Sequence, residues 1–468
     1  MTRPKESKNE NATAASVDGR YFQLAGSAEA VFEPGSYVVL ERQDGRRVLG
    51  QVDDLTFEMG GPFQGAGRIF GVVSDNGHGL DTHEVRPFAS ATVEQADAST
   101  IELLYSGTPA TLTIGSYGSD NATARLLANR FNRHTFWCGQ SGSGKTYALG
   151  VVLEQLILHT SLPIVIFDPN ADFVNLGGRP EGNASGMEGL PSDRDIRVLR
   201  PSPANTRALV VRFTDLPLRA RGAILHLHPL NDREEYNELM RLEETVGTLD
   251  PANVVPRLRD RGTEAAEALA ARIENLRVID WAVWSGPRET ATEILQHRPD
   301  ATVLDLGGFA NPDEPLVVAM AVLEDLWAKR EERKPLLIVI DEAHNLCSPE
   351  GESPLHVAVR EKIIQIAAEG RKFGLWLLLS TQRPSRIHPS IISQCDNLAL
   401  MKMASPVDLK EIATIFGFVP AAMLERSPLF RQGEALFAGS FVPAPMLVKM
   451  GNRLTPEGGS DLHVPLRP

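Results

Sequence analysis

The residues best suited to chemistry in this 468-residue chain form one short glycine-rich run, Gly139-Gln140-Ser141-Gly142-Ser143-Gly144-Lys145-Thr146. The run fits the pattern G-x-x-x-x-G-K-[ST], in which the glycines let a loop turn so that backbone N–H groups point at a phosphate. Lys145 adds positive charge, the Thr146 hydroxyl can bind Mg²⁺, and a following helix presents its positive end. We therefore predict a nucleoside triphosphate site formed by these eight residues and the adjoining Tyr147.

A second chemical signal lies about 200 residues downstream, where the apolar run Leu336–Ile340 ends in Asp341 and Glu342. A buried strand would carry both acids to its carboxyl end. There we expect Asp341 to hold Mg²⁺ and Glu342 to polarise an attacking water, which predicts ATP hydrolysis. The sequence Asp-Glu-Ala-His also occurs in some helicases, but those need a second motor domain, so we interpret His344 as a contact residue.

Gln382 and two arginines are further candidates. Gln382 is the last of three polar residues that follow the apolar run Leu377–Leu379. Its amide could contact both phosphate and water as a sensor if that strand lies between the other two motif strands. An ordinary glutamine at a strand end fits as well. Arg371 closes a helix and Arg133 precedes the strand of the glycine-rich loop. Either could act on a neighbouring subunit's phosphate, which accelerates phosphoryl transfer roughly 10³–10⁵-fold, or could be a helix-end cation or a solvated side chain.

The elements that must position these residues alternate along the chain as apolar strand, polar loop and amphipathic helix. This alternation predicts an α/β core with a parallel sheet. The expected strands are Thr135–Cys138, Ile164–Phe167, Ile196–Leu199, Thr302–Leu306, Leu336–Ile340, Leu375–Ser380 and Leu398–Met401.

The other segments suggest how the chain is divided. We expect a disordered tail over 1–18 and a small β-barrel over 19–95, with a type I′ hairpin turn at Asp44-Gly45. The first part of the ATPase core spans 96–217 and includes a strand at Thr111–Ile114 and a helical stretch around Ala122–Asn129. A charged helical insertion follows over 218–298. The second part of the core spans 299–448, and a polar tail covers 449–468.

Composition narrows the class of protein. The chain is 42% hydrophobic and 23% charged, with a net charge of −13, which argues against a surface that coats nucleic acid but leaves room for a basic channel. Cys138, Cys347 and Cys395 are isolated in apolar sequence, so we expect small buried side chains rather than disulfide or zinc ligands. The polar N-terminus and the short apolar runs predict a cytoplasmic protein without a membrane span.

Four segments together resemble the HerA branch of the HerA–FtsK ATPases: NRHTFWCGQSGSGKT, IVIFDPNADF, LLIVIDEAHNL and EGRKFGLWLLLSTQRPSRIHPSIISQCDNLALMKM. The resemblance extends from the N-terminal barrel, which looks like that family's HAS-barrel, to about Met450. It implies a RecA-like P-loop core in a hexameric ring that pumps double-stranded DNA, commonly with a nuclease partner such as NurA.

Carried over residue by residue, the resemblance makes Lys145 and Thr146 nucleotide residues, Asp341 and Glu342 metal and water residues, and Gln382 the sensor. It also raises Arg133 and Arg371 as inter-subunit arginines. The family's usual DPHGEY reads Asp168-Pro169-Asn170-Ala171-Asp172-Phe173 here, which leaves the role of that loop open. The Gly/Pro-rich tail offers no helical strap for a neighbouring subunit, so ring stability is less assured.

Two functions remain open at this point. The leading hypothesis is an ATP-driven double-stranded DNA translocase or helicase that works with a nuclease in DNA end processing or antiviral defence. The alternative is a HerA-like assembly platform whose ATP turnover regulates a bound nuclease or sirtuin-like effector in phage defence. A conjugative or secretion ATPase is disfavoured by the barrel and the lack of a membrane segment. Arg219, Arg221, Arg383 and Arg386 are the candidate DNA contacts.

Overall fold

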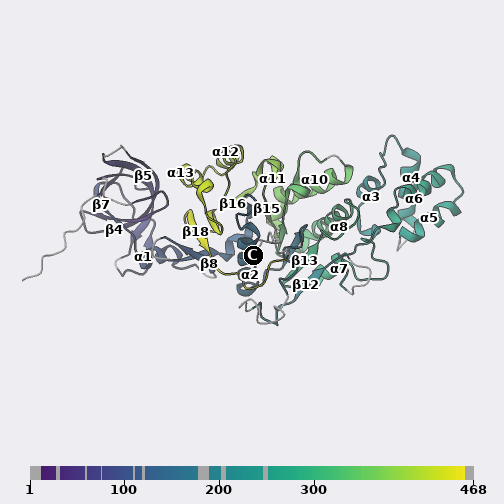
Figure 1. Cartoon of the computed structure of the whole chain (residues 1–468), viewed down its shortest axis with the longest axis horizontal. Helices are drawn as coiled ribbons and strands as arrows, with labels where there is room; N and C mark the ends of the chain where they lie inside the picture. The colour runs from purple at the N-terminus through teal and green to yellow at the C-terminus, as the bar shows by residue number, and fades with distance from the viewer. Residues whose placement is uncertain are drawn as a thin grey trace, which may run out of the picture. The chain divides into compact units, whose positions relative to one another are not determined.

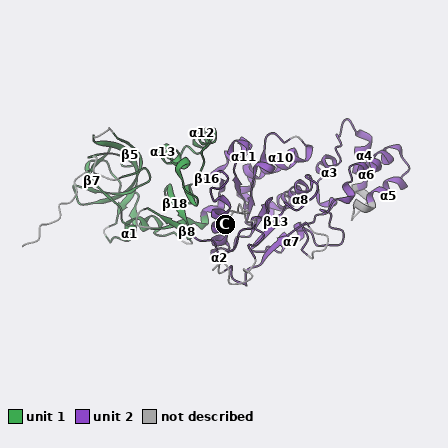
Figure 2. Ribbon diagram, in the orientation of Figure 1, with its two compact units in different colours: residues 1–129, 398–451 green, residues 130–397, 452–468 purple. Residues whose placement is uncertain are grey.

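A computed structural model describes residues 12–27, 32–57, 61–74, 76–108, 111–118, 122–177, 189–201, 207–245, 251–351 and 353–458, except the side chains of 243–245 and 251–253. Figure 1 shows the elements in chain order. The chain forms two compact units: residues 1–129 with 398–451, and residues 130–397 with 452–468 (Figure 2). The second unit contains the glycine-rich loop and both acids of the predicted site.

The N-terminal part of the first unit is a closed barrel of six antiparallel strands. The barrel closes because β2 pairs with both β1 and β5, so the six strands leave no open edge among themselves. Phe22, Val38, Leu40 and Phe63 fill its interior. The strands are β1 (Ala12–Ser16), β2 (Tyr21–Gly26), β3 (Tyr37–Arg42), β4 (Arg47–Phe57), β5 (Phe63–Val73) and β7 (Phe88–Gln95), with the short β6 (Leu80–Asp81) paired to β5.

Two expectations for this region are wrong. The predicted disordered tail reached residue 18, but β1 lies within it and pairs with β2 and β7, because the alternating small side chains of Ala12 and Ala14 face the core. Residues 1–11 lie outside the described residues. The hairpin at Asp44-Gly45 exists, but Gly45 alone has a positive φ, 78°, and the bonding of Arg42 to Arg46 makes a three-residue loop rather than a type I′ turn.

The rest of the first unit contains further antiparallel strands. Strand β18 pairs with β17 and β8, and β8 pairs with β9. The helical stretch expected around Ala122–Asn129 is therefore wrong, because residues with good helix propensity pair with β8, for example Leu126 opposite Leu112. The elements are α1 (Ala98–Glu102), η1 (Leu103–Tyr105), β8 (Thr111–Tyr117), β9 (Ala122–Leu127), α12 (Pro406–Ile415), α13 (Ala421–Leu424), η8 (Ser427–Leu429), β17 (Glu434–Gly439) and β18 (Met446–Met450).

The second unit is built on a parallel sheet whose strands lie in the order β12-β13-β11-β14-β15-β10. Most positions in these strands are apolar and most are buried, because helices cover both faces of a parallel sheet. Strand β15 lies between β14 and β10, as the sensor hypothesis requires. The strands are β10 (His134–Cys138), β11 (Ile164–Asp168), β12 (Ile196–Leu199), β13 (Ala301–Asp305), β14 (Leu336–Ile340) and β15 (Leu375–Thr381), and β16 (Cys395–Met401) leads into the first unit.

Helices connect these strands and form most of the described part of 218–298. Helix α6 is capped by Thr263 and packs against α4 and α5. The helices and 3₁₀ turns of this unit are η2 (Ala128–Asn132), α2 (Lys145–His159), η3 (Phe213–Asp215), α3 (Leu218–Ile224), α4 (Arg233–Thr245), α5 (Pro251–Asp260), α6 (Glu264–Asn275), η4 (Val278–Asp280), α7 (Ala291–Gln296), α8 (Glu314–Ala328), η5 (Arg330–Glu332), α9 (His344–Cys347), α10 (Pro354–Glu369), η6 (Gly370–Phe373), η7 (Pro384–Arg386) and α11 (Pro389–Ile392).

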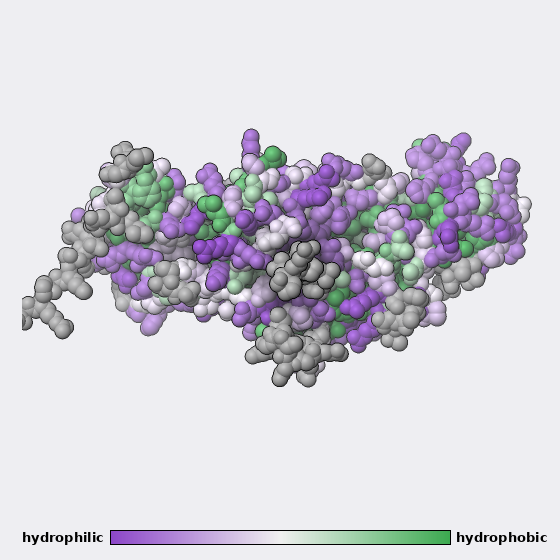
Figure 3. Space-filling view, in the orientation of Figure 1, coloured by the Kyte–Doolittle hydropathy of each residue, from purple (hydrophilic) through white to green (hydrophobic). Residues whose placement is uncertain are grey.

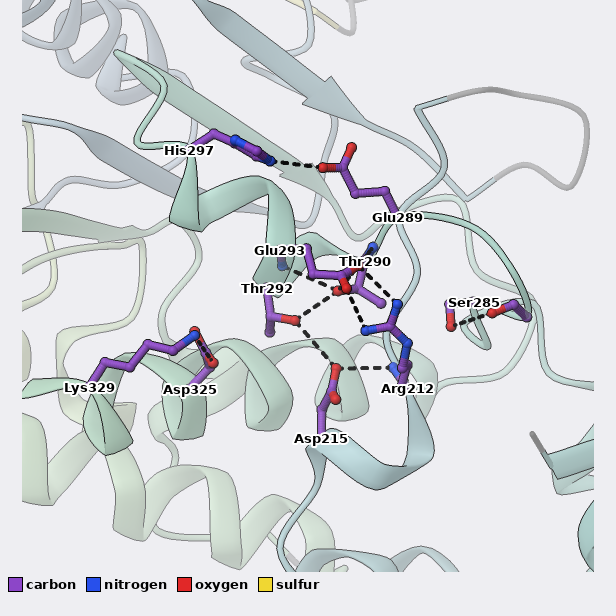
Figure 4. A network of polar contacts seen from close by, with 11 residues as sticks. Arg212, Asp215, Ser285, Glu289, Thr290, Thr292, Glu293, His297, Asp325 and Lys329 are labelled. Carbon is purple, nitrogen blue, oxygen red and sulfur yellow. Dashed lines mark hydrogen bonds and ion pairs between the residues drawn. The ribbon is translucent and has the colours of Figure 1, made fainter. Parts of the chain in front are cut away.

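A polar network fixes the end of the helical segment before β13 (Figure 4). Thr290 and Glu293 form a capping box at the start of α7. Arg212 donates two hydrogen bonds to the Glu293 carboxylate, at 2.7 and 3.0 Å. These bonds lower the pKa of Glu293 to about 2. The Thr292 hydroxyl donates to the carboxylate of Asp215, which lies in η3 and links this turn to α7. Its polar groups bond to one another, so we interpret it as structural.

Eight large apolar side chains are exposed among the described residues. On the face shown in Figure 3, the part over α4–α6 is mostly hydrophilic. Cys138, Cys347 and Cys395 are buried and free, as expected from their apolar surroundings. Among the described residues, no helix has the length and apolar character needed to cross a bilayer.

Candidate nucleotide-binding site

The glycine-rich loop joins β10 to α2 at the carboxyl end of the sheet. Gly142 and Gly144 have φ angles of 74° and 85°, in the left-handed region that favours glycine. Gly144 caps α2, and Lys145, Thr146 and Tyr147 form the first turn of this 15-residue helix. The positive end of the helix therefore faces the loop, as an anion site requires.

Lys145 connects three segments that are distant in sequence. Its side chain is 4% exposed, and its Nζ donates to Asp341 Oδ1 at 2.9 Å and to Ser380 Oγ at 2.8 Å. Glu342 Oε1 lies 3.1 Å from the same nitrogen. Burial alone would lower the pKa of Lys145, but the carboxylates of Asp341 and Glu342 outweigh it and raise that pKa. The ammonium is therefore held charged at the centre of the site.

Glu342 has an unusual backbone and a tightly held carboxylate. Its φ is +41°, and the N–H of Ala343 donates to Ser380 O at 2.8 Å, which fixes the turn after β14. Its Oε1 accepts from Gln382 Nε2 at 2.8 Å. Burial raises the pKa of Glu342, but the contacts with His344, Lys145 and Gln382 outweigh it, and the pKa falls to about 2. Glu342 is thus an ionised carboxylate that can accept a hydrogen bond from water.

Gln382 and His344 surround that carboxylate. Gln382 directly follows β15, so its position between the glycine-rich loop and Asp341 comes from the strand order. His344 Nδ1 lies 3.3 Å from Glu342 Oε2 and 3.2 Å from Thr381 Oγ1. His344 is therefore in contact with the site, where its ring can orient the glutamate.

Sequence reasoning left open an acidic group that the structure places beside Asp341. Carboxylate oxygens of Asp168, Asp172 and Asp341 all lie within 4.8 Å of one another. Burial, reinforced by the neighbouring carboxylates, raises the pKa of Asp168 to about 6 and that of Asp172 to about 7. Among the described residues, Asp341 Oδ2 is buried and accepts no hydrogen bond. Such a set of oxygen donors suits Mg²⁺. The sequence signal that could have indicated this group is Asp168, an acid at the end of β11, which pairs with β14.

The two candidate arginines lie elsewhere. Arg133 precedes β10 and Arg371 precedes β15, so both stand at the amino ends of strands whose carboxyl ends form the site. A strand of five residues spans about 17 Å. Both arginines instead pair with Asp396, Arg133 at 3.9 Å. The structure therefore does not bring them to the nucleotide site of their own chain.

The candidate DNA contacts give a mixed result. Arg219 pairs with Glu361 at 3.0 Å and Arg386 with Glu350 at 3.1 Å, and both arginine side chains are at least half exposed. Arg221 is buried and donates to Leu216 O at 2.9 Å, because α3 packs its inner face against the core. Arg221 is therefore wrong as a contact with DNA.

The fold and the geometry of the Lys145 site define a P-loop ATPase. Comparison with known proteins supports this class and indicates a family within it. The family model described as the central domain of helicase HerA matches residues 112–325. The DNA double-strand break repair helicase HerA of Saccharolobus solfataricus is 25% identical, over 90% of this chain and 88% of the relative. The Pyrococcus furiosus protein of the same name is 29% identical, over 71% of this chain and 68% of the relative.

Two solved structures share the fold. VirB4 of Thermoanaerobacter pseudethanolicus has a TM-score of 0.51 at 16% identity, over 73% of this chain and 96% of that one. The bacterial conjugative coupling protein TrwB has a TM-score of 0.51 at 13% identity, over 77% and 94%. These two likenesses concern the fold alone, while the family model and the relatives above support a HerA-like ATPase.

Proposed function

We propose that the site hydrolyses ATP with Mg²⁺ and that Lys145, Thr146, Asp341, Glu342 and Gln382 carry the reaction. The observation that carries this proposal is the buried contact of Lys145 with Asp341 and Ser380, which joins the phosphate loop to the acidic strand end. Gly139 to Tyr147 would surround the phosphates and the adjoining part of the nucleotide. When bound, Mg²⁺ would neutralise phosphate charge between Thr146 and Asp341.

Each side chain then has one task. Lys145 is charged and aimed at the acids, so it can neutralise the β- and γ-phosphates. Glu342 is ionised and accepts a hydrogen bond from water, which orients the water for attack. Gln382 already bonds Glu342, and its remaining amide atoms can contact the γ-phosphate or the water. Asp168 and Asp172 extend the oxygen donors next to Asp341.

We further propose that the chain acts as a double-stranded DNA translocase or helicase, in a hexameric ring that works with a nuclease in DNA end processing or antiviral defence. Similarity to HerA helicases over most of the chain supports the DNA substrate. The position of Arg133 and Arg371, away from their own nucleotide site, supports a ring in which arginines act across subunits.

Steady-state ATPase rates with increasing linear duplex test the DNA proposal. We expect duplex to bind and to raise turnover with saturation, whereas Lys145→Ala should hydrolyse no ATP at any concentration. A single strand of the same sequence is the matched control for duplex preference. A flat rate together with no measurable duplex binding would contradict the translocase and favour an assembly platform that regulates an effector.

A further inference from the structure

Residues 452–458, called here the C-terminal arm, belong to the ATPase unit and contact its helix α2 and the loop after β11. The N–H of Arg453 donates to the Tyr147 hydroxyl at 2.9 Å. At the other end, the N–H of Gly458 donates to Asp172 O at 3.0 Å. Asn175 Nδ2 donates to Glu457 O at 3.2 Å. The arm thus joins the first turn of α2 to the loop that follows β11. This segment is part of the predicted polar tail over 449–468, and sequence reasoning gave it no contact with the ATPase unit.

A buried glutamate on α2 is dedicated to the arm. Glu154 is 1% exposed, and its carboxylate accepts from the N–H groups of Leu454 and Thr455 at 2.7 and 2.8 Å. The Thr455 hydroxyl donates to the same carboxylate at 2.6 Å. A buried carboxylate is costly unless it is paired and hydrogen-bonded, so these contacts fix the arm against α2.

Arg453 fills the space between the helix and the loop. Its guanidinium is fully buried, lies 5.5 Å above the Phe173 ring, and is 3.6 Å from Glu154. Among the described residues, none of its guanidinium nitrogens makes a hydrogen bond. A Cβ on Gly150 would lie 2.5 Å from Arg453 Nε, which explains a glycine in mid-helix despite a cost of about 1 kcal/mol.

The loop that the arm holds carries the acids of the site and is strained. Ala171 has a φ of 60°, a conformation that costs a non-glycine residue roughly 1–2 kcal/mol. It lies between Asp168 and Asp172, whose carboxylates face Asp341. A strained loop keeps its shape only when its surroundings determine it. The arm supplies such contacts directly after Ala171, at Asp172 and Phe173.

We propose that Arg453 is a positioning residue of the ATP site, which holds the Asp168–Phe173 loop at a set distance from the P-loop helix so that its acids support Mg²⁺-dependent binding of nucleotide. The inference rests on the proposed role of the Lys145–Asp341 site. It predicts that disturbing Arg453 weakens the contribution of Mg²⁺ to nucleotide binding, although Arg453 touches neither ligand.

The test compares Arg453→Met with Arg277→Met. This matched control is at an arginine whose side chain is 79% exposed and whose ion-pair partner among the described residues is Asp280. Three quantities are measured: the melting temperature, kcat and KM for ATP, and the affinity for a fluorescent ATP analogue with Mg²⁺ and with EDTA. In Arg453→Met we expect the affinity gained from Mg²⁺ to fall about tenfold and KM to rise in proportion. Arg277→Met should match wild type in both.

Gly150→Ala tests the same contact from the side of α2, because its new methyl group would displace the Arg453 guanidinium. We expect it to reduce the affinity gained from Mg²⁺ as Arg453→Met does, although Arg453 is still present. Should Arg453→Met fail to fold, Thr455→Val removes only the hydroxyl contact with Glu154 and should lower the Mg²⁺-dependent gain two- to threefold. An unchanged gain and KM in the folded variants, with only a lower melting temperature, would overturn the proposal. The Lys145→Ala variant tests the ATPase site separately, since loss of its turnover does not depend on the arm.

Discussion

At the scale of single residues, the site is organised around the carboxylate of Glu342. His344, Lys145 and Gln382 contact this carboxylate from three segments, and together they lower its pKa to about 2. Glu342 is therefore ionised throughout the neutral pH range. In the proposed reaction it would therefore orient and polarise water rather than titrate near neutrality.

Glu342→Gln should separate binding from hydrolysis. The amide keeps the size of the side chain but lacks the negative charge that attracts a water proton, so we expect turnover to fall roughly 10²–10⁴-fold. Affinity for ATP should stay within a few-fold of wild type, because Lys145 and the glycine-rich loop are intact. Equilibrium binding and steady-state hydrolysis measure the two effects. Wild-type turnover in this variant would refute the assignment of Glu342.

At the scale of elements, the strands of the parallel sheet could be predicted because their apolar runs are continuous and buried on both faces. The expected positions of β14 and β15 hold to within a residue at their ends. Strand β9 could not be predicted, because Ala124 and Leu126 favour a helix locally and only pairing with β8 makes them a strand. Strand β1 was missed because its alanines give no strong alternation of polarity.

The same contrast applies to the site. The glycine-rich loop and the Asp341–Glu342 pair follow local patterns that a sequence displays directly. The contacts of Asp168 and Asp172 with Asp341 depend on β11 lying beside β14, and strand order is not written in either segment. The link from Arg453 to Phe173 joins residues about 280 apart, so no local pattern could predict it.

His134 illustrates how an element end is fixed in the sheet. It is fully buried, its Nδ1 accepts from the N–H of Leu377 at 2.9 Å, and its Nε2 donates to Ala367 O at 3.0 Å. Burial and the nearby positive charge of Arg371 lower its pKa from 6.5 to about 4. The neutral ring therefore joins β10 to β15 and to the end of α10.

Stability should consequently depend on pH through His134. The unfolded chain binds this proton below about pH 6.5, whereas the folded chain binds it only near pH 4, so the contribution is complete above pH 6.5 and is lost as pH falls to 4. The loss for the wild type relative to His134→Gln, which does not titrate, should be on the order of 3 kcal/mol. Denaturant unfolding at several pH values measures it. A difference that is constant from pH 7 to pH 4 would contradict this role.

At the scale of the whole molecule, the parallel sheet separates two groups of candidate functional residues. The phosphate loop, the acids and Gln382 stand at the carboxyl ends of its strands, while Arg133 and Arg371 stand at the amino ends. Asp396 holds both arginines near one another. Under the proposed ring, one edge of each subunit would present the nucleotide and the other would present arginines to a neighbour.

Mixing variants tests this shared site. Arg371→Ala subunits and Glu342→Gln subunits should each hydrolyse ATP poorly alone, because one lacks the arginine and the other the catalytic carboxylate. In mixtures, some interfaces would combine an intact Glu342 with an intact Arg371, so we expect partial recovery of turnover that peaks near equal proportions. Arg277→Ala in place of Arg371→Ala is the control. The shared-site proposal fails if no ratio of the two subunits exceeds the sum of their separate rates.

The separation of the two groups by the length of a strand also bears on when ATP is consumed. Under this proposal, a subunit on its own would bind nucleotide but would lack the neighbouring arginine that stabilises the transition state. It would therefore hydrolyse ATP slowly. When the protein is diluted, the ATPase rate per subunit should then fall well before the fraction of subunits with bound nucleotide does. Assembly would act as a safeguard that ties fuel consumption to the presence of a completed machine.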